Sequence, residues 1–78
     1  MTSKENTAIK SWLTANGYIF KTYEGMDGIM VNTNYDGEHP KAETFKAHYE
    51  IERYINRFHK EVKTEQRGHW TGLWIWQR

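Results

Sequence analysis

The sequence contains no cysteine, a single proline and no long hydrophobic run. Because cysteine is absent, disulfide bonds and cysteine-based zinc sites are excluded. No apolar stretch approaches the ~18 residues that mark a membrane-spanning helix, and the first residues, MTSKENTAIK, lack the apolar core of a signal peptide. From these features we expect a cytoplasmic protein that has no membrane partner.

Neither sign of charge is in clear excess. Eleven Lys and Arg residues stand against ten Asp and Glu residues, so the formal net charge is +1. Proteins dedicated to binding nucleic acid usually carry a lopsided positive charge. The balance therefore disfavours a dedicated polyanion binder, although it is compatible with a local basic stripe.

Catalytic and metal-binding signatures are missing as well. The chain has no G-x-S-x-G motif, no glycine-rich phosphate loop and no H-E-x-x-H motif. His48 and Glu52 have the spacing of neighbours on a helix, but His59 would lie about 10 Å further along the axis, too far for one metal ion. We therefore expect no enzyme activity, no cofactor and no metal site.

Aromatic side chains, in contrast, are abundant and make up 15% of the 78 residues. A chain of this length buries only about 60% of the surface that it exposes when unfolded, so its core must be filled efficiently. Each aromatic residue can bury roughly 150–250 Å². We therefore expect one domain spanning residues 1–78, with a core of bulky side chains and no covalent links.

The first half of the chain has the pattern of a helix followed by a hairpin. Thr2 and Glu5 have capping-box spacing before apolar residues at helical intervals, and Asn16-Gly17 is typical of a helix end. Two β-prone runs follow, with a short turn between them that ends in Asp-Gly. The two runs are residues 18–23 and residues 29–35, and the turn between them ends in Asp27-Gly28.

The second half predicts a long helix and a closing strand. Between Thr44 and Lys63, six apolar side chains fall within an arc of ~100°, as in an amphipathic helix. They are Ala47, Ile51, Tyr54, Ile55, Phe58 and Val62. The last ten residues, HWTGLWIWQR, favour a strand. The element order α-β-β-α-β then predicts a two-layer α+β domain. Its three-stranded antiparallel sheet would have the order 2-1-3, with both helices on one face.

The closing strand is apolar on both faces, whereas the predicted helices cover only one. By the alternation of side chains along a strand, the tryptophans share one side, and Leu73 and Ile75 share the other. In one arrangement the tryptophans form the core. We favour the other, in which Leu73 and Ile75 pack on the helices and the tryptophans lie open near Tyr23, because several inward indoles would crowd a small core.

An open aromatic face and an edge strand both favour association with a partner. Our leading hypothesis is a non-enzymatic interaction module that binds another protein, or itself as a homodimer, through this sheet face and the C-terminal edge strand. Such a protein would be an adaptor or an inhibitor, for example a phage or mobile-element protein that acts on host machinery. The predicted partner-binding residues are Trp70, Trp74, Trp76, Arg78, Tyr23 and Lys21.

The second hypothesis is nucleic-acid binding, because aromatic side chains on an open sheet can stack unpaired bases. Four basic residues of the long helix fall within roughly 60° of one another and could contact phosphates. These are Lys46, Arg53, Arg57 and Lys60. A simpler explanation remains open, in which acidic neighbours such as Glu50 pair with them at i,i+4 spacing and stabilise a solvated helix.

Overall fold

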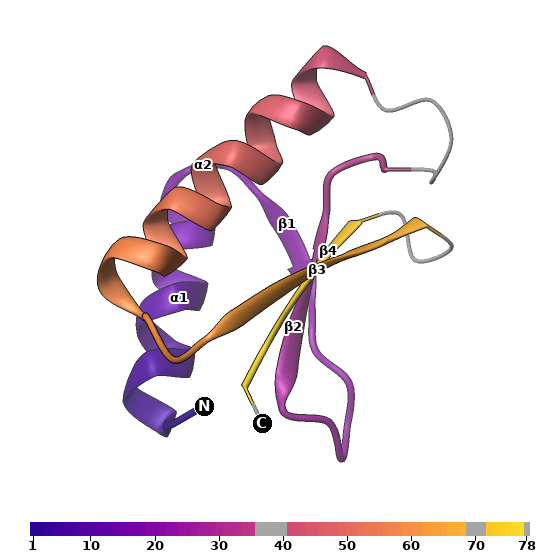
Figure 1. Cartoon of the computed structure of the whole chain (residues 1–78). Coiled ribbons are helices and arrows are strands. Elements are labelled where there is room, and N and C mark those ends of the chain that lie inside the picture. Colours follow the sequence, from indigo (N-terminus) through magenta and orange to yellow (C-terminus); the bar gives the residue numbers. More distant parts are fainter. Residues whose placement is uncertain (36–40, 69–71, 78) are drawn as a thin grey trace.

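The computed structural model describes residues 1–35, 41–68 and 72–77. It contains two helices and a four-stranded sheet, and both helices lie on the same side of the sheet (Figure 1). The α+β class predicted from the sequence is confirmed. Within the described residues, neither helix has the length and apolar content that a bilayer crossing requires. The elements in chain order are α1 Ser3–Ala15, β1 Ile19–Lys21, β2 Gly28–Asn32, α2 Ala42–Phe58, β3 Lys63–Arg67 and β4 Gly72–Trp76.

Helix α1 begins and ends at the predicted signals. The Thr2 hydroxyl accepts a hydrogen bond from the Glu5 N–H at 3.1 Å, and the Glu5 carboxylate accepts one from the Thr2 N–H at 3.1 Å. This reciprocal pair satisfies two N–H groups that the first helical turn leaves free. At the other end, Gly17 adopts a left-handed φ of 78° and turns the chain into β1.

The β1–β2 connection turns three residues earlier than predicted, at Gly25 and not at Gly28. Gly25, with a left-handed φ of 79°, forms the tight turn, which is closed by a hydrogen bond from the Met26 N–H to the Tyr23 carbonyl at 3.1 Å. Gly28 instead opens β2. A Cβ at Gly28 would overlap the ring of Trp74 on the neighbouring strand, so this glycine is required for packing and not for the turn.

The predicted sheet was wrong in its number of strands and in their order. Helix α2 ends at Phe58, and the segment KTEQR, part of which we had assigned to the helix, forms the extra strand β3. The sheet order is β1-β2-β4-β3, with every neighbouring pair antiparallel. Because β3 reverses the chain once more, β4 returns antiparallel to β2 and pairs with it directly. The C-terminal strand is therefore central in the sheet and not an edge.

The core lies between the helices and the inner face of the two central strands. Leu73 and Ile75 of β4 are fully buried there, in the arrangement that we favoured from side-chain alternation. The core consists of aliphatic residues from both helices and both central strands, together with Val62 from the connection between α2 and β3, with half-buried aromatic residues around it. Its members are Ile9, Leu13, Ile29, Val31, Ile51, Ile55, Val62, Leu73 and Ile75.

A buried polar contact joins the end of β2 to the first turns of α2. The Thr44 hydroxyl donates to the Thr33 carbonyl at 2.7 Å, and the Thr33 hydroxyl lies 2.6 Å from Nε2 of His48. All three side chains are buried. Because buried polar groups are costly unless they are hydrogen-bonded, this contact fixes where α2 begins over the sheet.

Candidate functional site

The outer face of the sheet is less open than the sequence suggested. Lys21, Met30, Trp74 and Glu65 lie side by side across the four strands. Neither of the described helices covers this face, yet Trp74 is only 5% exposed and Met30 is 4% exposed. The Trp74 ring lies across Gly28, and its centroid is 6.4 Å from that of Tyr23. The predicted neighbourhood of Trp74 and Tyr23 is therefore found, but the prediction that Trp74 lies open is wrong.

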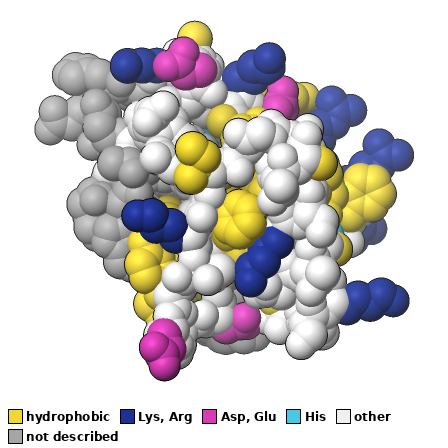
Figure 2. Space-filling view, turned by 180° about the vertical axis from the view of Figure 1, so that it is seen from behind, with side chains coloured by type: hydrophobic (Ala, Val, Ile, Leu, Met, Phe, Trp, Pro, Cys, Tyr) yellow, Lys and Arg dark blue, Asp and Glu magenta, His cyan; other side chains and the backbone are white. Residues whose placement is uncertain are grey.

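The remaining predicted partner-binding residues do not form one continuous surface. Lys21 is exposed and Tyr23 is 38% exposed, whereas Trp76 is half-buried with the Lys63 ammonium 5.3 Å from its ring centroid. Figure 2 shows hydrophobic side chains on one face of the molecule in separate small clusters, with Lys and Arg between and around them. The other two predicted residues, Trp70 and Arg78, lie outside the described residues.

The edges of the sheet also differ from the prediction. They are formed by β1 and β3, because β4 is paired on both sides. Strand β3 has the sequence KTEQR, and charged side chains on an edge strand discourage pairing with another chain. Strand β1 is only three residues long. Neither edge offers the long apolar strand on which we had based strand addition.

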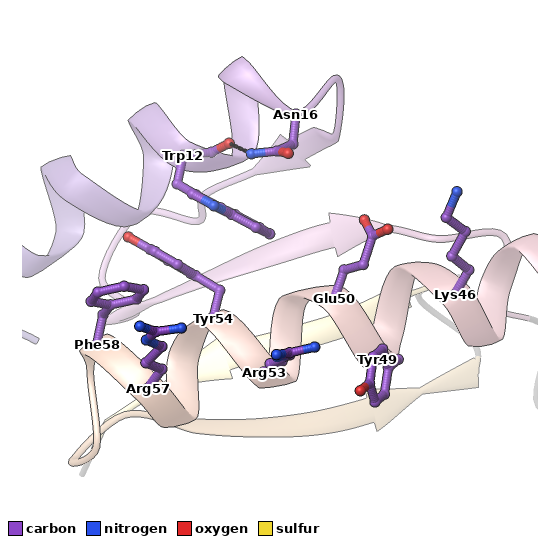
Figure 3. Close-up of a pocket in the computed structure, with 9 residues that line it drawn as sticks. All are labelled: Trp12, Asn16, Lys46, Tyr49, Glu50, Arg53, Tyr54, Arg57 and Phe58. Atoms are coloured by element: carbon purple, nitrogen blue, oxygen red, sulfur yellow. Dashed lines mark hydrogen bonds between the residues drawn. The ribbon is translucent and has the colours of Figure 1, made fainter.

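The basic residues of α2 lie in a different setting. A groove of about 610 Å³ between α1 and α2 is lined by Lys46, Arg53 and Arg57. Lys60 lies beyond the end of α2 and does not line this groove. Figure 3 shows the two helices on either side of this groove, with the labelled side chains between and beside them. The lining residues are Trp12, Asn16, Lys46, Tyr49, Glu50, Arg53, Tyr54, Arg57 and Phe58.

An aromatic stack forms the apolar part of the groove. The rings of Trp12 and Tyr54 lie face to face, with centroids 4.2 Å apart and an interplanar angle of 4° (Figure 3). Phe58 extends the stack, 5.5 Å from Tyr54, and Tyr18 lies 6.0 Å from Trp12. Offset aromatic pairs of this kind add stability beyond the area that they bury. The stack therefore holds the two helices together and forms a preorganised apolar surface.

Hydrogen bonds hold the polar ends of this stack. The Tyr18 hydroxyl donates to the Glu50 carboxylate at 2.6 Å, and burial together with this hydrogen bond raises the pKa of Tyr18 to about 12. The Tyr54 hydroxyl lies 2.9 Å from Nε2 of His59, and burial raises the pKa of Tyr54. Both phenols are therefore neutral near pH 7, and the one carboxylate of the groove already has a donor.

The cations of the groove lack carboxylate partners in the described part of the chain. The ion pairs found there join Met1 to Asp27, Glu5 to His59, and Glu65 to Arg67. The pairs that would explain the basic stripe as a solvated helix face, such as Lys46 with Glu50, are not among them. Arg57 instead lies over the Phe58 ring, 5.3 Å from its centroid. Lys46 and Arg53 are therefore exposed cations beside an apolar surface.

Three large side chains on α2 are exposed, two of them (Tyr49 and Phe58) in the lining of this groove, and sequence reasoning missed all three. Phe45, Tyr49 and Phe58 are 61%, 63% and 62% exposed. A signal was present for two of them, because Phe45 and Tyr49 have i,i+4 spacing on the helix side opposite the apolar arc. Phe58, in contrast, falls in the apolar arc that we predicted to face the core, and its exposure shows that this placement was wrong.

The two histidines in the described part of the chain, His48 and His59, take part in the packing of the fold. His48 contacts Thr33, and His59 contacts Tyr54. Among the described residues, no three His, Cys, Asp or Glu side chains are placed to hold a metal ion together.

Comparisons of this chain with protein-family models, with curated proteins and with solved structures find no match.

Proposed function

We propose that this protein is a small non-enzymatic interaction module that binds another protein through the α1–α2 groove and the exposed aromatic side chains of α2. The observation that carries the proposal is the exposure of Phe45, Tyr49 and Phe58 beside Lys46 and Arg53, which have no ion-pair partner in the described residues. Aromatic residues and arginine dominate the binding energy of protein interfaces.

The helix side of the molecule suits this role better than the outer face of the sheet. At the centre of the sheet face, Trp74 and Met30 are already buried within the monomer, so a partner would remove little more of their surface from water. Phe45, Tyr49 and Phe58 of α2 still expose most of their surface. Such a module would work as an adaptor or an inhibitor, in the manner of phage or mobile-element proteins that act on host machinery.

Capture from a nuclease-treated lysate of the source organism tests this proposal. The bait proteins are the wild type, the double variant Phe45→Ala/Tyr49→Ala, and the control variant Ile19→Ala, which removes an exposed apolar side chain from β1. We expect the wild type and the control to retain the same protein, and the double variant to lose it. The retained protein is then purified and the three affinities are measured. Equal retention by the double variant would refute the proposal.

A second candidate function is nucleic-acid binding in the same groove. The observation that favours it is the presence of Lys46, Arg53 and Arg57 along one groove with aromatic rings beside them. Phosphate contacts release bound counterions, so such binding should weaken steeply between about 50 and 200 mM salt. A protein contact through the aromatic residues should change little over that range. Light scattering on the purified protein tests the remaining option, a homodimer formed through the same residues.

A further inference from the structure

The cations of the groove form a row of defined length. Lys46 and Arg57 are separated by about 16 Å along α2, at ~1.5 Å per residue. Arg53 lies between them, and all three side chains line the same groove. An extended peptide advances ~3.3 Å per residue, so about five residues would cover this distance. The row therefore fits a short chain segment that carries more than one negative charge.

One carboxylate interrupts the row. Glu50 lines the groove between Lys46 and Arg53, and its position is held by the hydrogen bond from the Tyr18 hydroxyl. A nucleic acid strand carries a negative phosphate at every nucleotide, so it would bring one of them close to Glu50. A peptide can place acidic residues opposite the cations and a neutral residue opposite Glu50. Local charge therefore favours a peptide over a polynucleotide.

The apolar surface of the groove points to the same kind of ligand. The faces of Trp12 and Tyr54 are stacked on each other, so a base cannot insert between them without breaking the contact that joins the helices. The exposed Phe58 ring and the outer side of the stack can still contact an apolar side chain. Burying such a side chain stabilises a complex more than an exposed ion pair does, because an exposed ion pair is screened by solvent and salt.

We propose that the groove binds an acidic segment of a partner protein, with its carboxylates on Arg53 and Arg57 and an apolar side chain against the Trp12–Tyr54 stack. This inference rests on the proposed function and adds the chemistry of the partner segment. Arginine suits the role because its planar guanidinium can bind a carboxylate through two parallel hydrogen bonds.

Selection from a random-peptide library on the immobilised protein tests the inference. We expect the enriched peptides to carry two or more Asp or Glu residues next to an apolar residue. Enrichment should be lost with Arg53→Glu/Arg57→Glu and kept with Lys60→Glu, which reverses a charge outside the groove. Both substitutions are at exposed positions, and circular dichroism checks that each variant remains folded. Enriched peptides without acidic residues, peptides that survive the double reversal, or no enrichment at all would each overturn the inference.

Affinity measurements then separate the charge from the sequence of the ligand. Fluorescence anisotropy compares a selected peptide with its counterpart in which Asn and Gln replace Asp and Glu. We expect binding to weaken by about tenfold or more, which corresponds to ~1.4 kcal/mol. A single-stranded DNA homopolymer serves as the competing polyanion, and displacement of the peptide by DNA at lower concentration than by unlabelled peptide would overturn the inference. If neutral peptides are enriched while Phe45→Ala/Tyr49→Ala still abolishes capture of a cellular protein, the inference fails but the proposed function stands.

Discussion

At the scale of single residues, His48 is a titratable side chain that the fold buries. It is buried between β2 and α2, its Nε2 lies 2.6 Å from the Thr33 hydroxyl, and the Tyr35 ring lies 5.5 Å from the imidazole. Burial lowers the pKa of His48, because a protonated imidazole would lose its hydration without gaining a carboxylate partner. The folded state therefore favours the neutral form.

This burial makes stability dependent on pH. Since the pKa of His48 is lowered on folding, the unfolded chain binds a proton first as the pH falls, and the free energy of unfolding decreases below about pH 6.5. Above that pH, His48 is neutral in both states and contributes no pH dependence. Urea denaturation between about pH 7 and pH 5 should show this decrease. His48→Gln should flatten it, and an unchanged slope in that variant would assign the effect to another group.

Gly72 is a second position where one residue controls the packing. A Cβ there would overlap the Val31 carbonyl carbon and oxygen on the adjacent strand, and both are backbone atoms that cannot rotate away. We expect Gly72→Ala to reduce the free energy of unfolding by about 3 kcal/mol, as overpacking of a rigid site does. Chemical denaturation followed by tryptophan fluorescence measures the change.

Gly25→Ala is the matched control for this substitution. Gly25 has open space around it, and its left-handed backbone should cost only ~1 kcal/mol when alanine replaces glycine. Equal effects at the two positions would mean that strand β4 can shift relative to β2.

At the scale of elements, the contact between α1 and α2 depends on the Trp12–Tyr54 stack. At the end of α1, the Asn16 side chain donates to the Trp12 carbonyl at 2.8 Å. Two residues later in the chain, the Tyr18 hydroxyl donates to the Glu50 carboxylate of α2. The end of α1 is thus joined to α2 by both ring stacking and a hydrogen bond. These contacts set the width of the groove, because its two walls are the two helices.

A double-mutant cycle isolates the contribution of the stack. Trp12→Leu and Tyr54→Leu each keep an apolar side chain but remove one ring. We expect a coupling energy of about 1 kcal/mol between the two positions, in the range measured for aromatic pairs. Peptide binding in the groove should weaken in each single variant as well. A coupling energy near zero would show that area burial alone holds the helices together.

At the scale of the whole molecule, the two sides of α2 differ in burial. Its inner side contributes Ile51 and Ile55 to the aliphatic core, whereas its outer side exposes Phe45 and Tyr49. On the outer face of the sheet, the Trp74 ring packs across Gly28 and is itself buried. Among the described residues, the large apolar side chains that α2 exposes therefore lie on the same helix as the cations of the groove, whereas Ile19, Tyr23 and Met26 are exposed on β1 and in the connection to β2.

This difference in burial predicts that substitutions on the two sides of α2 change the free energy of unfolding by very different amounts. Phe45→Ala/Tyr49→Ala should change the free energy of unfolding by less than about 0.5 kcal/mol, because both side chains are exposed. Ile51→Ala, at a fully buried position, should lower it by about 2–5 kcal/mol. Thermal or chemical denaturation of the three proteins measures both effects. A large destabilisation by the double variant would mean that Phe45 and Tyr49 support the fold.

Several elements could be predicted because their signals are local. The capping box at Thr2 and Glu5, the apolar arc of α2 and the alternation that buries Leu73 and Ile75 each depend on residues close together in the chain. Strand β3 was missed because KTEQR contains no apolar residue, and an edge strand needs little burial to form. The groove could not be predicted either, because no sequence spacing shows that Trp12 of α1 packs against Tyr54 of α2.

By itself, then, the sequence determined the class of the fold, the faces of its main elements and the basic stripe of α2. Only the tertiary structure decided that β4 is central, that Trp74 is buried and that the cations lie along a groove. The physical reason is that side-chain periodicity depends on neighbours within a few residues. Strand order and helix contact depend instead on backbone pairing and packing between segments that are far apart in the chain.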